Sequence, residues 1–90
     1  MKKKTATPKP QQIQMYSTTW CGDCRRSKRF FDLHQIPYLE INIEEHPDAA
    51  QTVMALNNGM RSVPTILFPD GTVLVEPSNQ ALAKKLGLEI

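Results

Sequence analysis

Residues 15–24 read MYSTTWCGDC, and this stretch decides the fold because a strand, a C-x-x-C motif and a helix meet in it. Residues 13–17 alternate in polarity between turn-forming residues, which predicts a strand. The apolar residues Phe30, Phe31 and Leu33 then predict a helix from near Cys21 to about His34, with cations on its other faces. The motif therefore lies where the first strand ends and the first helix begins.

Two further elements follow in the middle of the chain. Residues 38–43 alternate again and predict a second strand, whose apolar side consists of Leu39, Ile41 and Ile43. Pro47 suits the first position of a second helix, because proline lacks the N–H that this position leaves unpaired. Residues 57–59, Asn-Asn-Gly, supply the stop of that helix.

The last third of the chain predicts a hairpin and a helix. Strands at 65–68 and 72–75 flank an Asp-Gly turn at 70–71. Ser78 can cap a final helix that Gly87 ends. The order β-α-β-α-β-β-α predicts an α/β fold, with the first two strands parallel and joined by a right-handed crossover. We expect a mixed four-stranded sheet flanked by helices.

The charge distribution separates a basic tail from the rest of the chain. The formal net charge of the 90 residues is +2, but four of the eleven cations lie in the first ten residues. The remaining seven cations against nine acids give −2, which argues against nucleic-acid binding. Residues 1–12 are polar and predict a disordered tail, which leaves a domain at 13–90. Neither a secretory signal nor a membrane span is expected. We therefore expect a soluble cytoplasmic protein.

The motif Cys21-Gly22-Asp23-Cys24 predicts thiol–disulfide chemistry. A helix N-terminus presents unpaired N–H groups, which favour the thiolate of Cys21. Cys24 lies three positions on, on the same helix face and within reach of Cys21 for a disulfide. Gly22 is expected to let the backbone turn and a partner approach. The negative charge of Asp23 has the opposite effect and disfavours a thiolate at Cys21.

The cations that follow the motif are expected to stabilise a thiolate and attract an anionic substrate, although a solvated helix face explains them equally well: Arg25, Arg26, Lys28 and Arg29. Three other interpretations of the cysteines stay open. They are a zinc site completed by His34 and His46, a structural disulfide, and an inert thiol pair.

Residues 15–24 resemble the glutaredoxin branch of the thioredoxin superfamily, and especially its mycoredoxin and NrdH-type groups. Two later stretches carry the resemblance further, GMRSVPT at 59–65 and FPDGT at 68–72. The resemblance covers residues 13–88. It implies a thioredoxin fold and a thiol–disulfide oxidoreductase with Cys21 as nucleophile and Cys24 as resolving thiol.

The resemblance also implies a substrate-binding set of Trp20, Arg61, Val63 and Pro64. The Val63–Pro64 bond would be cis, with Pro64 facing the motif and the Val63 backbone offered to an extended substrate. Arg61 would pair with a substrate carboxylate. Judged by residue type alone, Val63 is core, Pro64 a trans edge residue and Arg61 a surface charge.

The sequence departs from glutathione-type glutaredoxins in three places. Gly22 and Asp23 replace proline and tyrosine, residues 17–20 hold no lysine, and residues 76–79 read EPSN where a Gly-Gly pair is usual. Mycothiol, or direct reduction by thioredoxin reductase, therefore fits the chain better than glutathione does. No bound cofactor or metal is expected, and the partners would be disulfide-containing proteins or protein mixed disulfides met by a monomer.

Two alternative functions remain open at this stage. One is a dithiol electron donor, for example to ribonucleotide reductase. The other is an iron–sulfur or metal carrier, a role that usually goes with a single motif cysteine, so the presence of Cys24 argues against it.

Overall fold

The computed structural model describes residues 10–88, and its elements follow the predicted order. They are β1 (Ile13–Ser17), α1 (Gly22–Leu33), β2 (Tyr38–Asn42), α2 (Pro47–Leu56), β3 (Thr65–Leu67), β4 (Val73–Val75) and α3 (Asn79–Leu86). Residues 1–9, which hold most of the predicted tail, lie outside the described residues, as do residues 89–90. Within the described range no helix is long and apolar enough to cross a membrane.

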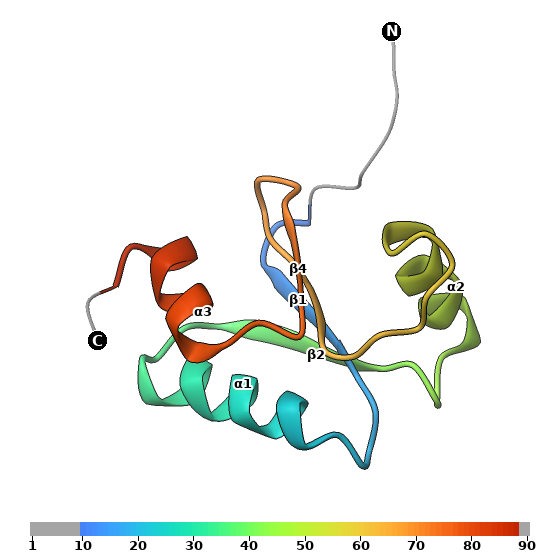
Figure 1. Cartoon of the computed structure of the whole chain (residues 1–90), viewed down its shortest axis with the longest axis horizontal. Coiled ribbons are helices and arrows are strands. Elements are labelled where there is room, and N and C mark those ends of the chain that lie inside the picture. The colour runs from blue at the N-terminus through green and yellow to red at the C-terminus, as the bar shows by residue number, and fades with distance from the viewer. Residues whose placement is uncertain (1–9, 89–90) are drawn as a thin grey trace, which may run out of the picture.

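The sheet has the strand order β2-β1-β3-β4, which confirms the predicted mixed four-stranded sheet. β1 and β2 run parallel in a register that pairs Ile13 with Tyr38, and α1 connects them. β3 lies antiparallel to both β1 and β4. In Figure 1, α1 and α3 lie on one side of the sheet and α2 lies on the other.

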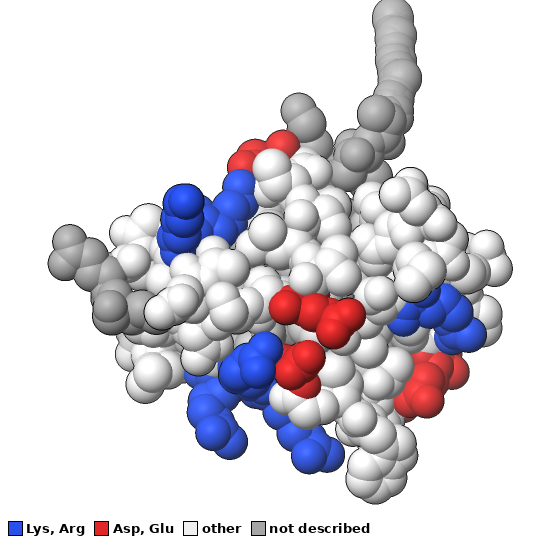
Figure 2. Space-filling model, viewed as in Figure 1, with Lys and Arg blue, Asp and Glu red and all other residues white. Residues whose placement is uncertain are grey.

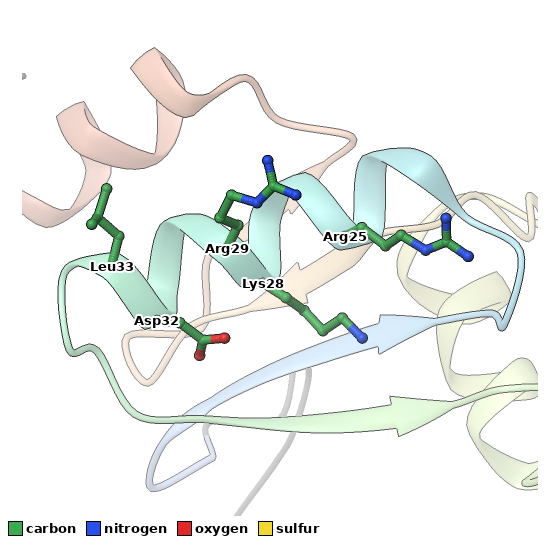
Figure 3. A pocket seen from close by; sticks show the side chains of 5 residues that line it. All are labelled: Arg25, Lys28, Arg29, Asp32 and Leu33. Carbon is green, nitrogen blue, oxygen red and sulfur yellow. The ribbon is translucent and has the colours of Figure 1, made fainter.

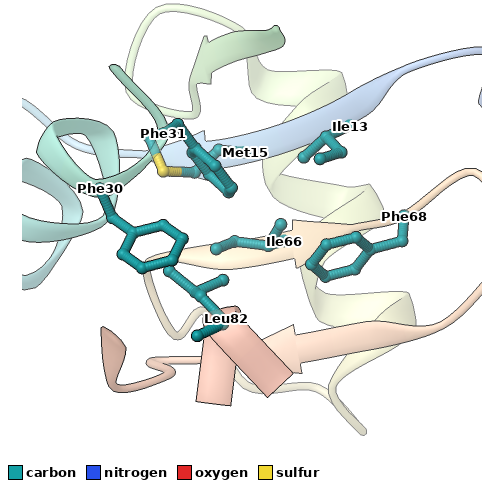
Figure 4. Close-up of a cluster of buried hydrophobic side chains, with 8 residues drawn as sticks. Ile13, Met15, Phe30, Phe31, Ile66, Phe68 and Leu82 are labelled. Carbon is teal, nitrogen blue, oxygen red and sulfur yellow. The ribbon is translucent and has the colours of Figure 1, made fainter. Parts of the chain in front are cut away.

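The main core lies between the sheet and the helices α1 and α3. The buried side chains of this cluster come from the sheet side of the chain and from both helices: Ile13, Met15, Phe30, Phe31, Ile66, Phe68, Leu82 and Ala83. Figure 4 shows Phe30 and Phe31 reaching from α1 toward Met15 and Ile66 on the central strands. Because these large apolar side chains are withdrawn from water together, this layer fixes α1 against the end of β1.

A smaller cluster lies on the other face of the sheet, under α2. It consists of Tyr16, Ile43, Ala50, Val53 and Leu67. Since successive strand residues point to opposite faces of a sheet, Met15 belongs to the main core and Tyr16 to this smaller cluster. Burial raises the pKa of Tyr16 above its ordinary value.

Two residues predicted on apolar faces are exposed instead. Leu33 is 75% exposed, because it follows Phe31 by about 200° around the helix axis and so leaves the buried stripe. Leu39 is 45% exposed. Its strand β2 is an edge strand, and the cluster under α2 includes Ile41 and Ile43 but not Leu39.

The predicted turn and cap residues act as expected. Ser78 Oγ accepts a hydrogen bond from the N–H of Ala81 at 3.0 Å and caps α3, and Gly87 ends it in the left-handed region with φ 71°. In the hairpin, Gly71 adopts φ 89°, and Asp70 Oδ1 accepts from the N–H of Thr72 at 3.0 Å. Local sequence signals therefore set the turn between β3 and β4 and the two ends of α3.

Candidate functional site

Cys21 and Cys24 form a disulfide at the first turn of α1. Their Cα atoms lie 5.2 Å apart, within the range that a disulfide spans. Cys21 is the N-cap residue of α1, with extended backbone angles of −110° and 109°. Its Sγ accepts a hydrogen bond from the N–H of Cys24 at 3.0 Å, where a serine or aspartate oxygen would stand in an ordinary cap.

The two sulfur-bearing residues differ in accessibility. Cys24 is 1% exposed and belongs to the buried face of α1, whereas Cys21 is only partly buried. A partner approaching from solvent therefore meets Cys21 first. On reduction, a thiolate at Cys21 would stand at the helix N-terminus, where the dipole and the free N–H groups favour negative charge.

The residues before β3 face this disulfide from a distant part of the chain. The Val63 carbonyl oxygen lies 3.7 Å from Cys21 Sγ, and the Val63–Pro64 bond is cis, as predicted. Because this bond is cis, the alternative interpretation of Pro64 as a trans edge residue is wrong, and the Pro64 side chain is buried. Val63 makes no backbone–backbone hydrogen bond within residues 10–88, which leaves its N–H and C=O open to an incoming chain.

The other two predicted substrate-binding residues lie in solvent. Trp20 is 85% exposed directly before Cys21, and Arg61 is exposed two positions before Val63. Met60, beside Arg61, is 62% exposed as well and was not among the residues predicted from the sequence. The only sequence signal for it is its place between the helix stop and the Pro64 segment.

The cations after the motif divide into engaged and free ones. Arg26 Nη1 lies 3.2 Å from Asp23 Oδ1, so the negative charge inside the motif is paired. Lys28 Nζ lies 3.2 Å from Glu40 Oε2. Arg25 and Arg29 are exposed and form no ion pair within the described residues. In Figure 2, Lys and Arg side chains gather over the position of α1.

A shallow groove lies along the outer face of α1. All five residues that line it belong to this helix: Arg25, Lys28, Arg29, Asp32 and Leu33 (Figure 3). None comes from the segments that carry Trp20 or Val63. The groove is therefore a solvated helix face next to the disulfide and not a part of the disulfide site.

A polar network that the sequence analysis missed anchors the strand end that leads to Cys21. Ser17 is 1% exposed, and its Oγ donates to Glu40 Oε2 at 2.8 Å. Two residues on, the N–H of Thr19 donates to Glu44 Oε1 at 3.2 Å, and Asn42 Nδ2 donates to Thr19 Oγ1 at 3.1 Å. These contacts tie the loop before the motif to the end of β2. The polar residue at the end of an apolar strand was the available signal.

The two histidines lie on different elements. His34 caps the C-terminal end of α1 and packs against Phe30, with ring centroids 4.4 Å apart. His46 precedes α2. Within residues 10–88 no three His, Cys, Asp or Glu side chains gather in a way that could hold a metal ion.

A C-x-x-C disulfide at the start of the first helix, faced by a cis-proline segment on a four-stranded mixed sheet, defines a thiol–disulfide oxidoreductase of the thioredoxin fold. The chain belongs to the glutaredoxin family, whose model matches residues 13–74. A solved thioredoxin-like protein has the same fold, with a TM-score of 0.78 at 21% identity, over 89% of this chain and 100% of that one.

Three curated relatives are similar to this chain in sequence. A Mycobacterium tuberculosis protein named "Putative glutaredoxin" is 40% identical over 74 residues, 82% of this chain and 88% of the relative. Mycoredoxin 1 of Corynebacterium glutamicum is 32% identical, over 72% of this chain and 80% of its own length. The glutaredoxin-like protein NrdH of Lactococcus lactis is 33% identical, over 64% of this chain and 78% of its own length.

Proposed function

We propose that Cys21 is the attacking thiol and Cys24 the resolving thiol in the reduction of mixed disulfides between proteins and a small thiol. The observation that carries the assignment is the difference in exposure, with Cys21 reachable at the helix N-terminus and Cys24 buried behind it. Cys21 thiolate attacks the sulfur of the small thiol in the mixed disulfide, so a disulfide forms between Cys21 and the small thiol, and the protein leaves as a free thiol. A second molecule of the small thiol then attacks this bond and leaves as the small-thiol disulfide with Cys21 free; alternatively, Cys24 attacks Cys21, closes the Cys21–Cys24 disulfide and releases the small thiol.

The substrate chain is proposed to lie along the segment before β3. Val63 would pair with it through its free backbone groups, next to the sulfur of Cys21 and over Pro64. Trp20 would cover an apolar part of the partner, since an indole left in solvent gains most when a partner buries it. Arg61 would pair with a carboxylate of the small thiol or of the protein.

Mycothiol is the proposed small thiol. The support is the departure of residues 17–23 and 76–79 from the glutathione-type pattern, together with the likeness to mycoredoxin 1. We further propose that the protein works as a cytoplasmic monomer, because a cysteine pair that is repeatedly oxidised needs a compartment that supplies reductant.

The Cys24→Ser variant tests this function. It is offered one peptide as a mixed disulfide with mycothiol and, in parallel, with glutathione, and release of the free peptide thiol is followed by mass spectrometry. We expect the variant to release the peptide from the mycothiol substrate faster than from the glutathione one. Cys21→Ser is the matched control and should release none.

A second candidate function is a dithiol electron donor recycled by thioredoxin reductase. It is favoured by the intramolecular disulfide and by the NrdH relative. If the Cys24→Ser variant is inactive with both mixed disulfides while the wild type reduces protein disulfides, Cys24 is obligatory and the dithiol donor replaces the first proposal.

A further inference from the structure

Ser27 carries a buried hydroxyl without a hydrogen-bond partner. The buried polar residues between positions 10 and 88 are Ser17, Ser27 and Thr65. Ser17 donates to Glu40, and the Thr65 hydroxyl accepts from Asn57 and donates to the Ser62 carbonyl. The Ser27 hydroxyl finds no partner among the described residues, although it is 0% exposed. Such a group is costly, so its presence in a core asks for a reason.

The hydroxyl lies one helical turn from the buried sulfur of the disulfide. Cys24 and Ser27 are three positions apart and both belong to the buried face of α1. Side chains at this spacing are neighbours, with Cβ atoms about 5–6 Å apart. They also lean toward the helix N-terminus, which directs the Ser27 side chain toward the turn that carries Cys24.

We propose that Ser27 is a positioning residue that donates a hydrogen bond to the sulfur of Cys24 once the disulfide has opened. In the disulfide, Cys24 Sγ is bonded to Cys21 and needs no donor. When it becomes a thiolate, it is an anion in a buried place and needs one. The bond therefore favours the ionised form of Cys24, and with it the reduced protein. This inference rests on the resolving role proposed for Cys24.

Among residues 10–88, no charged group competes for this task from within the core. The titratable side chains on the first turns of α1 and on the adjacent strand β2 are all partly or fully exposed: Asp23, Arg25, Arg26, Lys28, Tyr38 and Glu40. Four of them are paired as Asp23–Arg26 and Lys28–Glu40. On β1, the titratable Tyr16 packs in the cluster on the opposite face of the sheet. Ser27 is thus the buried polar side chain that shares a face with Cys24.

The bond acts on the attacking thiol in the step that closes the disulfide. It raises the ionised fraction of Cys24, and the same stabilisation of the thiolate makes the equilibrium less favourable to the disulfide. Cys24 loses its proton to solvent, and its thiolate attacks Cys21 Sγ in the mixed disulfide. The Cys21–Cys24 bond forms, the bond from Cys21 to the partner sulfur breaks, and the partner leaves as a thiolate that takes a proton from solvent. Ser27 keeps its own proton throughout and only orients and stabilises the attacking sulfur.

The competing explanation is that a small residue is needed where α1 packs closely on the sheet. Alanine would satisfy that need without burying a hydroxyl. The Ser27→Ala variant therefore separates the two explanations. If packing is the only role, removing the unpaired hydroxyl leaves the chemistry of Cys24 unchanged.

The first measurement compares Cys21→Ser with Cys21→Ser/Ser27→Ala and follows alkylation of Cys24 against pH. The pH midpoint should rise by about one unit in the double variant, which is the size of one hydrogen bond to a charged acceptor. Both proteins carry the Cys21→Ser substitution, so its effect on the pH midpoint cancels in the comparison. An unchanged midpoint would overturn the proposal.

The second measurement titrates the wild type and Ser27→Ala against a dithiothreitol redox buffer at a pH where both thiols are ionised. The equilibrium should move about tenfold toward the disulfide in the variant, because only the reduced form loses a bond. Urea unfolding of the oxidised proteins should show Ser27→Ala at least as stable as the wild type. Unfolding of the reduced proteins gives the matching comparison. An unmoved equilibrium, with the same change of stability in both redox states, would overturn the proposal and leave packing as the whole role.

Neither measurement uses a protein or small-thiol substrate. Failure of the mixed-disulfide assay would thus remove the proposed function without touching these results. If the protein reduces mixed disulfides but the pH midpoint of Cys24 alkylation and the redox equilibrium stay unchanged in the Ser27→Ala variants, only the role of Ser27 is removed.

Discussion

The Ser17–Glu40 hydrogen bond should contribute measurably to stability, and a double-mutant cycle can isolate it. Glu40→Ala leaves the Ser17 hydroxyl buried without an acceptor, since Ser17 is 1% exposed and its Oγ bonds Glu40 at 2.8 Å. A buried unsatisfied hydroxyl costs about 1–3 kcal/mol. The lost Lys28–Glu40 pair, with both side chains about a third exposed, adds less than about 1 kcal/mol. The expected total is about 2 kcal/mol.

The opposite truncation should cost less. Ser17→Ala removes the donor, and Glu40 then turns its free oxygen to water, because its side chain is 36% exposed. The expected loss is about 1 kcal/mol, the net value of one hydrogen bond. In the Ser17→Ala background, Glu40→Ala should lose only the Lys28 pair. The coupling free energy between the two positions is therefore about 1–1.5 kcal/mol.

Urea unfolding followed by circular dichroism measures all four proteins in the oxidised state. With a slope of about 1–2 kcal/mol per M for a small domain, Glu40→Ala should lower the midpoint by on the order of 1 M. Lys28→Ala is the control for the ion pair and should lower it by a small fraction of that. If Glu40→Ala costs the same with and without the Ser17 hydroxyl, the coupling is zero and the network does not anchor the strand end.

Three further outcomes are expected. Asp70 has its pKa held below the ordinary range, first by the hydrogen bond from Lys85 and then by those from Thr72, so its stabilisation is present above about pH 4 and is lost as the pH falls toward the folded value. Asp70→Asn should therefore flatten the acid limb of stability in urea titrations between pH 7 and 3, and an unaltered limb would contradict this. Gly22→Ala should raise the urea midpoint slightly, because an added Cβ meets no atom within 4 Å and φ is not positive, and a lower midpoint would refute that reasoning. Trp20→Ala should change stability by less than about 0.5 kcal/mol but raise KM for a peptide mixed disulfide about fivefold, and an unchanged KM would remove Trp20 from the binding surface.

The elements were predictable where the signal was local. Ser78 and Gly87 bound α3, and the Asp70–Gly71 turn joins β3 and β4, because caps and turns depend on a few neighbouring residues. Leu33 and Leu39 were placed on buried faces by periodicity and are exposed. Periodicity tells which residues share a face, but only the tertiary arrangement tells how far a helix or a second layer covers it.

The role predicted for Gly22 separates into two parts. Gly22 was expected to let the backbone turn, but the conformational freedom special to glycine is not used there, because Gly22 is the first residue of α1 and has no positive φ. The expectation of close approach by a partner stays a prediction, supported by the open space beside its Cα. A residue type permits several conformations, so the sequence could not decide which property of glycine is used.

The site itself combines a local half and a distant half. The cap geometry of Cys21 and its bond from the N–H of Cys24 span three residues and follow from the physics of a helix N-terminus. The Val63 carbonyl beside Cys21 Sγ comes from 42 positions away, and only resemblance to a family could anticipate it. Ser27 could not be predicted from either half, because its importance depends on its burial and on the missing partner of its hydroxyl. Unsatisfied groups of this kind become visible only once the fold is known, and they are where a structure adds chemistry to a family assignment.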